Sequence, residues 1–316
     1  MGRFISQFRS AFGGRSRRSR RRRRPGGYPL FLAGTILGSS VLVLGIMWGG
    51  WTFWSSQFPD VRILRSQFPV VVPVASKAAI KVKPQSFSIR WSARRPDSWV
   101  SLSAIAPSAV EAVIVSEDAA YFSHPGYDVR EMREALKHDL EKGEFARGAS
   151  TITQQVAKNV FLNQEKSLWR KAKELFLAVR MSREVGKRRV LETYFNIVEW
   201  GPGIFGIQAA SAAYFGKSPA LLTAREGAFL AMLLPSPVRY SQSFRQRRLT
   251  PFARKRISQI IRKMLDAGYL TAEEAVAAMN ERMSFEQSEP MVPPDGSDDA
   301  QKQDEEIDQE AQEGET

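Results

Sequence analysis

The chain has 316 residues, no cysteine and a formal net charge of +13 at pH 7. The absence of cysteine excludes disulfides, thiolate nucleophiles and cysteine-ligated metal sites. The charge is unevenly distributed, because residues 1–27 hold ten Arg and no acid whereas residues 286–316 hold twelve acids and one Lys. Subtracting these +10 and −11 contributions from +13 leaves +14 on residues 28–285. Both ends are too polar to build a core, so one globular domain is expected.

An uncharged segment follows the N-terminal arginines. No charged residue lies between Pro25 and Pro59, and the apolar run within this segment exceeds the roughly 20 residues needed to cross a bilayer. Trp and Phe gather at its far end, as in an interfacial belt. We therefore predict a basic cytoplasmic arm over residues 1–27 and a transmembrane anchor over 28–54. A cleaved signal peptide is disfavoured, because bulky side chains occupy the place of small cleavage-site residues. In isolation the Arg run would also suit RNA, but its position before the span follows the positive-inside rule.

Residues 55–96 carry weaker signals. The segments Val70–Val74 and Ser86–Ala93 are apolar or alternating, which is typical of short strands, and several prolines argue against long elements. We expect a membrane-proximal linker with one hairpin. At the other end of the chain, residues 286–316 are predicted to form an acidic disordered tail.

From Pro107 onward the apolar periodicity is helical. The first helix places Val110, Val113, Ile114 and Phe122 on its apolar face. Glu117 and Asp118 fall at the end of this helix, where partial burial would raise the pKa of a carboxyl group and make it a better base near neutral pH. Further helices are predicted over 129–142, 151–163, 168–183, 187–198, 206–214, 223–234, 251–267 and 271–282. The domain is thus expected to be mainly helical.

The run Gly148–Gln155, with the sequence GASTITQQ, is the strongest functional signal. Its hydroxyl and amide side chains would all need partners in a core, so the run suits a groove that holds a many-hydroxylated ligand such as a sugar. Two carboxylates, Glu117 and Glu174, flank the run in the sequence and supply acid/base and charge-handling groups. Together these features predict carbohydrate chemistry on an activated, anionic donor.

Several ordered motifs make residues 97–265 resemble the family 51 glycosyltransferases, the peptidoglycan polymerases of class A penicillin-binding proteins. The motifs are Glu117 and Asp118 with Tyr121, His124 and Gly126; Gly148–Gln155 with Lys158 and Asn159; Arg170, Lys171 and Glu174; Lys187–Asn196; and a degenerate stretch with Arg254, Arg256, Ile260, Ile261 and Met264. Tyr121 stands where the family usually has Phe. The chain is most similar to the monofunctional biosynthetic peptidoglycan transglycosylases, which have one membrane anchor and one transferase domain.

The resemblance implies a mainly α, lysozyme-like transferase domain over residues 97–285, behind a single N-terminal transmembrane helix. It implies that the chain polymerises lipid II into β-1,4-linked glycan strands, with inversion at the donor anomeric carbon and release of undecaprenyl pyrophosphate. Glu117 would be the general base on the acceptor hydroxyl, and Glu174 with nearby cations would manage the leaving group. The expected location is the inner membrane, with the N-terminus cytoplasmic and the catalytic domain periplasmic.

The resemblance also assigns site residues and partners. The catalytic residues are Glu117 and Glu174, and the expected substrate-binding residues are Asp118, His124, Ser150, Thr151, Gln154, Gln155, Lys158, Asn159, Arg170 and Lys171. No cofactor is required and no metal ligand is assigned, although a divalent ion, Mg²⁺ or Mn²⁺, is optional. The expected partners are lipid II, the growing glycan chain and the inner membrane, with other cell-wall synthesis or division proteins as further candidates. Nucleic acid is not expected.

Other interpretations stay open at this point. A lysozyme-like lytic enzyme would also use a glutamate near a helix end, and a basic membrane-anchored scaffold would explain the charge. His124 suits either an acid/base role or a structural role in the turn before Gly126. Arg170 and Glu174 are also spaced as an ordinary i, i+4 pair on a helix surface.

Overall fold

The structure is a computed structural model that describes residues 28–56, 58–73, 87–142, 150–162 and 167–286. The chain separates into two compact units, Met1–Gln57 and Phe58–Thr316. The predicted basic arm and nearly all of the predicted acidic tail lie outside the described residues.

The described part of the first unit is one helix, α1 (Tyr28–Ser56). Within it, Thr35–Ser56 is long and apolar enough to cross a membrane, and none of that segment is buried against protein. An uncharged apolar helix of this length is consistent with a membrane-anchored protein.

The second unit is mainly helical, which confirms the predicted fold class. Its longer helices are α3 (Pro107–Glu117), α4 (Val129–Lys142), α5 (Ile152–Phe161), α6 (Leu168–Glu184), α7 (Lys187–Ile197), α8 (Ile207–Phe215), α9 (Ala224–Leu233), α12 (Pro251–Asp266) and α13 (Ala272–Asn280). Short helical segments join them, namely α2 (Ile63–Ser66), α10 (Pro237–Tyr240), α11 (Gln242–Arg245) and two 3₁₀ turns at Leu102–Ala104 and Pro219–Leu221.

Two small antiparallel hairpins complete the unit. The first pairs β1 (Phe68–Pro73) with β2 (Phe87–Ser92), which confirms the predicted hairpin. The second pairs β3 (Glu199–Gly201) with β4 (Ile204–Phe205).

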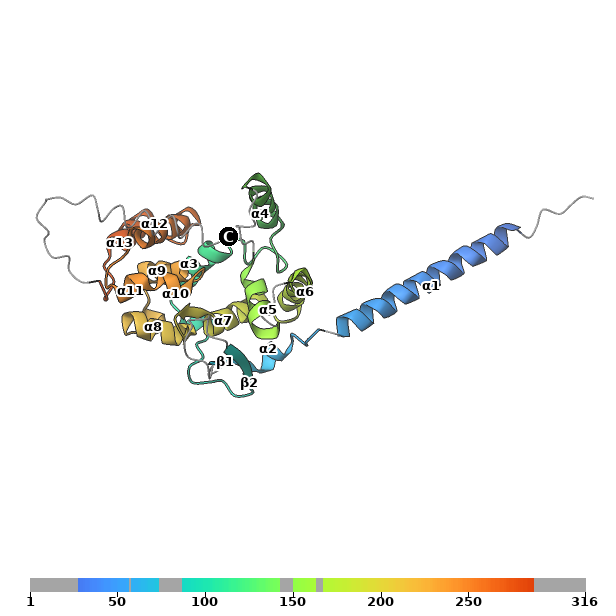
Figure 1. The fold of residues 1–316 in the computed structure, drawn as a ribbon, viewed down its shortest axis with the longest axis horizontal. Coiled ribbons are helices and arrows are strands. Elements are labelled where there is room, and N and C mark those ends of the chain that lie inside the picture. Colours follow the sequence, from blue (N-terminus) through green and yellow to red (C-terminus); the bar gives the residue numbers. More distant parts are fainter. Residues whose placement is uncertain (1–27, 57, 74–86, 143–149, 163–166, 287–316) are drawn as a thin grey trace, which may run out of the picture. The chain divides into compact units, whose positions relative to one another are not determined.

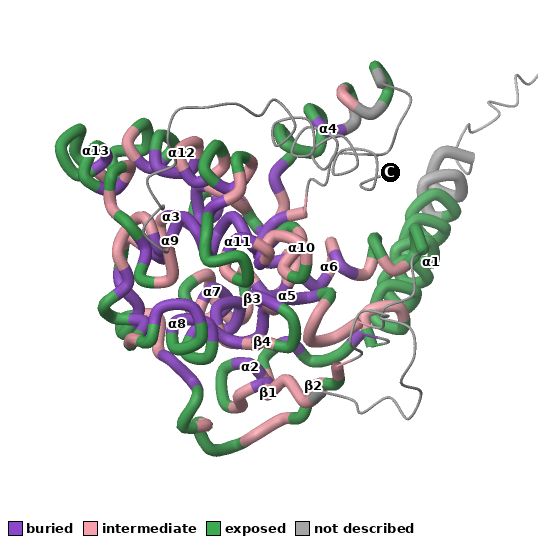
Figure 2. The backbone as a smooth tube through the Cα atoms, turned by 60° about the vertical axis from the view of Figure 1, so that its left-hand side comes forward, coloured by how far each residue is buried: buried purple, intermediate pink, exposed green. Residues whose placement is uncertain are grey.

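The helices form two packed groups that meet around a buried centre (Figures 1 and 2). In one group α3 packs against α9 and α12, and in the other α5 packs against α6 and α7. The contact between α3 and α9 is close because of Gly227, where an added Cβ would lie 2.6 Å from the Cα of Ala109. The apolar face of α12, which includes Ile257 and Ile261, closes the first group. This packing fixes the direction of α3, whose last residue is Glu117.

The segment before the catalytic motifs is part of the folded unit, although we expected a linker there. Val61 and Leu64 are buried. Arg189 of α7 donates hydrogen bonds to the carbonyl oxygens of Leu64 and Gln67, and its guanidinium lies 4.6 Å from the ring centre of Phe68. This interaction spans more than 120 positions of sequence, so local patterns gave no signal for it.

The predicted longer helices are all confirmed to within a few residues at each end, over the part of the chain that the structure describes. One core assignment was wrong. Phe122 was expected on the apolar face of the first helix, but α3 ends at Glu117 and Phe122 is 55% exposed. Asp118 ends the helix because its backbone leaves the helical region, with φ −164° and ψ 71°.

Candidate active site

The end of α3 presents Glu117 to a cleft. The backbone N–H of Asp118 still donates to the Ile114 carbonyl, and the chain then turns away from the helix axis. Ala112, Val113, Ile114 and Val115 are buried along α3. A helix held by so many apolar contacts keeps the carboxylate at its end in a defined position.

Glu117 is half-buried and has a neutral hydrogen-bond partner. The side-chain N–H of Gln155 donates to Glu117 Oε2 at 3.0 Å, and the Tyr194 hydroxyl donates to Gln155 Oε1 at 3.2 Å, which fixes the orientation of the amide. Burial raises the pKa of Glu117, while the Gln155 hydrogen bond and the charges of Arg256 and Lys263 oppose that rise. A carboxylate with a raised pKa is a stronger base, as the sequence analysis anticipated.

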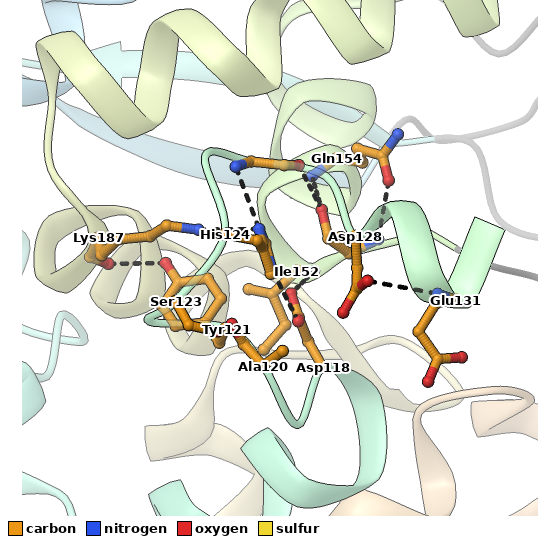
Figure 3. A network of polar contacts seen from close by, with 12 residues as sticks. Asp118, Ala120, Tyr121, Ser123, His124, Asp128, Glu131, Ile152, Gln154 and Lys187 are labelled. Carbon is orange, nitrogen blue, oxygen red and sulfur yellow. Dashed lines mark hydrogen bonds and ion pairs between the residues drawn. The ribbon is translucent and has the colours of Figure 1, made fainter. Parts of the chain in front are cut away.

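Asp118 connects α3 to the start of α5 (Figure 3). Its Oδ2 accepts from the backbone N–H of Ile152 at 3.0 Å, at the N-terminus of α5, and its Oδ1 lies 2.8 Å from His124 Nε2. His124 Nδ1 accepts from the N–H of Gly126 at 3.1 Å. Both oxygens of Asp118 and both ring nitrogens of His124 are therefore engaged within the protein. The two residues position the cleft, and the structural interpretation of His124 is favoured over an acid/base role.

The start of α5 is held by a capping box. The Thr151 hydroxyl accepts from the N–H of Gln154, and the Gln154 side chain accepts from the N–H of Thr151 at 2.9 Å. The Thr151 hydroxyl also donates to the Gly126 carbonyl at 2.8 Å. Such a cap satisfies N–H groups that have no partner inside the helix. Thr151 and Gln154, which we expected to bind substrate, thus hold the helix that carries Gln155.

A second layer lies beneath His124, where Tyr121 and Lys187 join α7 to the turn after α3. The Tyr121 hydroxyl donates to the Lys187 carbonyl at 2.7 Å, a bond that Phe at this position could not make. Lys187 Nζ lies 4.4 Å from the Tyr121 ring centre and 3.4 Å from His124 Nδ1. Burial lowers the pKa of Lys187 to about 8, with the charge of Asp118 opposing the change.

Glu174 lies in a contrasting environment on α6. Its side chain is 2% exposed, and its two oxygens lie 2.6 Å from Lys171 Nζ and 3.7 Å from an Arg170 nitrogen. Lys171 Nζ also donates to the Ser150 hydroxyl at 2.7 Å, which links this pair to the segment before α5. The predicted group of Glu174, Arg170 and Lys171 is therefore brought together in space.

Lys158 belongs to the same cationic group. It lies on α5, and desolvation lowers its pKa, with Glu174 opposing the shift and Arg170 and Lys171 adding to it. These three cations surround one carboxylate, so the group carries an excess of positive charge. Asn159, the neighbour of Lys158, makes no hydrogen bond through its side chain to any residue that the structure describes.

A cleft of about 710 Å³ opens beside Glu117. It is lined by Glu117, Asp118, Ser150, Thr151, Asp128, Arg130, Glu131, Arg256 and Lys263, among others. Glu174, Lys158 and Arg170 do not line it and connect to it through Lys171 and Ser150. The described structure thus gives two neighbouring parts of a site, one around each glutamate, with α5 between them.

Sequence reasoning missed one of the cations beside Glu117. Arg256 was assigned to the degenerate fifth motif, whereas Lys263 was assigned to no motif. They are seven residues apart, so two turns of α12 bring them to one side of the helix, away from the buried face. That spacing was the available signal, but only the packing of α12 on α3 shows that it faces the cleft.

The described residues contain no group of three or more His, Asp or Glu side chains placed to hold a metal ion. The one carboxylate in the cationic group, Glu174, already pairs with Lys171 and Arg170. In this group, the positive charge available to an anionic ligand therefore comes from the side chains of Lys158, Arg170 and Lys171.

Comparison with known proteins identifies the family. A family model described as Transglycosylase matches residues 85–265, which is more than half of the chain. The chain belongs to the transglycosylase family. This match covers the end of α3, the start of α4, the N-terminus of α5 and nearly all of α12, which lie around the cleft. It also covers α6 and α7, which pack against α5.

Several curated relatives carry the name biosynthetic peptidoglycan transglycosylase. The protein from Nitrobacter winogradskyi is 52% identical over 144 residues, which cover 45% of this chain and 63% of the relative. The proteins from Aromatoleum aromaticum and Nitrosospira multiformis are 42% and 37% identical, each over 54% of this chain and over 75% and 72% of their own lengths. The chain thus spans less than two thirds of the Nitrobacter protein. Among solved structures, Penicillin-Binding Protein 1A from Haemophilus influenzae aligns over 66% of this chain and 20% of its own, with 18% identity and a TM-score of 0.30.

Proposed function

We propose that this chain is a peptidoglycan glycosyltransferase that polymerises lipid II into β-1,4-linked glycan strands. The observation that carries the proposal is the half-buried Glu117, which has a raised pKa and lies in a cleft with Arg256 and Lys263. A base beside fixed cations suits attack by a hydroxyl on a donor with an anionic leaving group. The names of the relatives support the substrate class.

Glu117 acts as the general base. An alcohol is a poor nucleophile until its proton is removed, and Glu117 accepts the proton of the acceptor sugar's 4-hydroxyl as that oxygen attacks the donor anomeric carbon. The bond between this carbon and the pyrophosphate oxygen breaks, the configuration inverts, and undecaprenyl pyrophosphate leaves with the electron pair. Gln155 holds the Glu117 carboxylate during this step without neutralising its charge.

The cationic group on α5 and α6 stabilises the leaving group. Lys158, Arg170 and Lys171 supply positive charge where negative charge grows in the transition state, and Glu174 holds two of these cations in place. Glu174 therefore acts through the cations instead of removing a proton. No cofactor is required in this proposal, and a divalent ion, Mg²⁺ or Mn²⁺, is optional.

The chain is also proposed to lie in the inner membrane with its N-terminus in the cytoplasm. Ten Arg residues precede the uncharged α1, and the positive-inside rule then places the second unit in the periplasm. The growing glycan, the membrane and other cell-wall proteins would be its partners. A reporter that fluoresces only in the cytoplasm, fused after residue 285, should stay dark, and a bright signal would contradict this orientation.

The decisive test is the reaction of the purified full chain with lipid II in neutral detergent, with the product sized on a gel. We expect long glycan strands and release of undecaprenyl pyrophosphate. Cleavage of isolated sacculi without polymerisation would instead support a lytic enzyme, and no reaction in either assay would support a scaffold. Because the same wild-type chain is used in both assays, polymerisation, cleavage and the absence of reaction can be told apart.

A further inference from the structure

The basic charge of the second unit is concentrated beside the cleft. Between Pro235 and Asp266 the sequence holds nine Lys and Arg residues and a single acid, Asp266 itself. The exposed members are Arg245, Arg247, Arg248, Arg254, Lys255, Arg262 and Lys263, on α11, α12 and the turn between them. We call this region, together with Arg256 at its cleft end, the basic surface.

Much of the basic surface has no acidic partner within the described part of the chain. Arg247, Arg248, Lys255 and Arg262 form no ion pair there, although elsewhere Arg180 pairs with Glu184 and Arg189 with Glu192. Lys255 and Arg262 are seven residues apart, so they share one side of α12, next to the side that carries Arg256 and Lys263. The positive charge is therefore continuous from solvent into the cleft beside Glu117.

The acidic end of the chain starts beside this surface. Phe285, two residues before the tail of residues 287–316, packs on α11 with its ring centre 5.3 Å from that of Phe244. Phe285 also contacts Phe229 at 5.2 Å, which anchors this point of the chain to α9. Residues 287–316 hold eleven acids and one Lys, a net charge of −10. The tail thus leaves the folded unit next to Arg245 and the turn that carries Arg247 and Arg248.

We propose that residues 287–316 dock in cis on the basic surface, with their acidic side chains paired to its exposed cations. The sequence predicts no regular structure for these 30 residues, and such a chain would span roughly 30 Å on average, and more when like charges extend it, which is enough to reach along α12. Tethering gives an effective concentration on the order of millimolar, so even weak pairing keeps the tail bound for much of the time. Charge complementarity and the position of the tail's origin both favour this occupant.

Docking has a consequence for the cleft that rests on the proposed function. A tail bound along α12 places acidic side chains near Arg256 and Lys263, where an anionic donor would also be attracted. The tail then competes with the donor, and it does so most strongly at low ionic strength, where screening is weakest. The docking itself does not depend on which reaction the cleft catalyses.

The absence of native cysteine permits a direct test by fluorescence energy transfer in the full chain. One label is placed at Ala311→Cys in the tail and the other at Gln246→Cys, an exposed position before α12. The control pair combines Ala311→Cys with Ser98→Cys, an exposed position next to Trp99, whose ring packs on Phe68 of β1. In Figure 1, β1 lies on the opposite side of the unit from α12. In neutral detergent we expect high transfer to position 246 at about 20 mM salt, falling roughly two-fold at about 0.5 M salt, and lower transfer to position 98.

Two sets of variants identify the groups that pair. Replacing the eleven tail acids by Asn or Gln should abolish the salt-dependent transfer, as should the set Arg247→Gln, Arg248→Gln, Lys255→Gln and Arg262→Gln. The matched set Arg65→Gln, Arg94→Gln, Arg183→Gln and Arg188→Gln removes four exposed cations elsewhere and should leave it unchanged. Circular dichroism of each variant confirms that the helices are intact.

Several outcomes would overturn the proposal. Transfer that is unaffected by neutralising the tail or the four cations would show that the tail does not dock there. Transfer between singly labelled copies, rising with protein concentration, would assign the surface to a second copy. If the chain binds nanodiscs of anionic lipid through these four cations while the energy transfer stays low and salt-independent, the basic surface would be a membrane-binding surface. Full salt-dependent transfer in a chain that fails to polymerise lipid II would support docking and contradict only the proposed function.

Discussion

Glu117 and Glu174 are the same residue type in one site, yet their surroundings differ. Among the described residues, Glu117 accepts one hydrogen bond, from a neutral amide, and forms no ion pair with a cation. Glu174 is almost completely buried and is paired with Lys171 and Arg170. The first carboxylate keeps a lone pair available and has a raised pKa, whereas the second is neutralised by its partners. The difference shows how environment assigns a base to one glutamate and a positioning role to the other.

The backbone around each glutamate suits its role. Glu117 is the last residue of α3, where the helix ends and the chain opens onto the cleft. Glu174 lies within α6, where i, i+3 and i, i+4 spacing brings Lys171 and Arg170 to the same side. A helix end exposes a group to ligand, and a helix interior supplies regularly spaced partners. Substitutions at these two positions should therefore reduce turnover by different amounts.

The largest effect is expected for Glu117→Gln. The change keeps the volume and the hydrogen-bonding capacity of the side chain but removes the base, so the turnover on lipid II should fall about 10²–10⁴-fold. The matched control is Glu111→Gln on the same helix, which does not line the cleft and should keep near wild-type turnover. Retention of activity by Glu117→Gln would show that another group removes the proton.

A smaller loss is expected for Lys158→Ala. Removing one fixed cation from the leaving-group side should lower turnover by roughly 10²-fold, which is at the low end for a group that stabilises transition-state charge. If Lys158 holds the donor in the ground state instead, the Michaelis constant should rise more than turnover falls. Steady-state kinetics on lipid II separates the two effects. Wild-type values for both constants would exclude a role for Lys158.

Glu174→Gln should lower turnover by only about 10-fold. The substitution removes one charge-assisted hydrogen bond that holds Lys171, and such a bond contributes about 1.5 kcal/mol. In the double variant with Lys158→Ala, the combined loss should be smaller than the product of the single losses, because both act on the same developing charge. Strictly multiplicative losses, measured by the same kinetics, would show that the two groups act independently.

The pH dependence should distinguish the two glutamates further. Because the base must be ionised, kcat/KM should fall as the pH drops through the pKa of Glu117, which burial raises above 4.5. The Gln155 hydrogen bond favours the ionised form, so Gln155→Ala should raise this pKa again and move the acidic limb to higher pH. Asn159→Ala, which removes a neighbouring amide without contact to Glu117, should leave the limb in place. If the acidic limb of kcat/KM does not move in Gln155→Ala, that limb does not report the ionisation of Glu117.

The fold was predictable from the sequence where the signal is local. Apolar residues at helical spacing gave α3 to α9, α12 and α13, and a hydrophobic helix that ends in Glu117 predicted a partly buried carboxylate. The pairing of Lys171 and Arg170 with Glu174 also follows from spacing along one helix. In each case the interacting groups are within about one turn of each other.

The rest required contacts between distant segments. Asp118 accepts from the N–H of Ile152, 34 residues away, and this bond joins the end of α3 to the start of α5. Arg189 donates to the carbonyl oxygen of Leu64, which lies 125 residues away, and so helps fix the segment that we expected to be a linker. Lys263 reaches the cleft only because α12 packs on α3. No periodicity in the sequence encodes such long-range choices.

The smallest effects are expected on thermal stability. Replacing Glu117 by Gln should raise the melting temperature, whereas replacing Glu174 by Gln should lower it. Burial raises the pKa of Glu117 in the folded state, so its contribution to stability is fully present below the unfolded pKa near 4.5 and is lost as the pH rises through the folded value. At pH 7 the ionised Glu117 therefore destabilises the fold, and Glu117→Gln should unfold at a higher temperature than the wild-type chain. The difference should shrink as the pH falls below 4.5.

Glu174→Gln should do the reverse, because a neutral amide leaves Lys171 and Arg170 without a counter-charge. A loss of about 1–2 kcal/mol corresponds to a decrease in melting temperature of a few degrees for a unit of this size. Thermal unfolding in detergent at pH 7 and pH 4 checks both signs in one experiment, with Glu273→Gln, at an exposed position of α13, as the control for the substitution itself. A Glu117→Gln variant less stable than wild type at pH 7 would mean that the native contacts of the ionised carboxylate outweigh its desolvation. The contrast between a desolvated base that destabilises the fold and a paired positioning residue that stabilises it would then no longer hold.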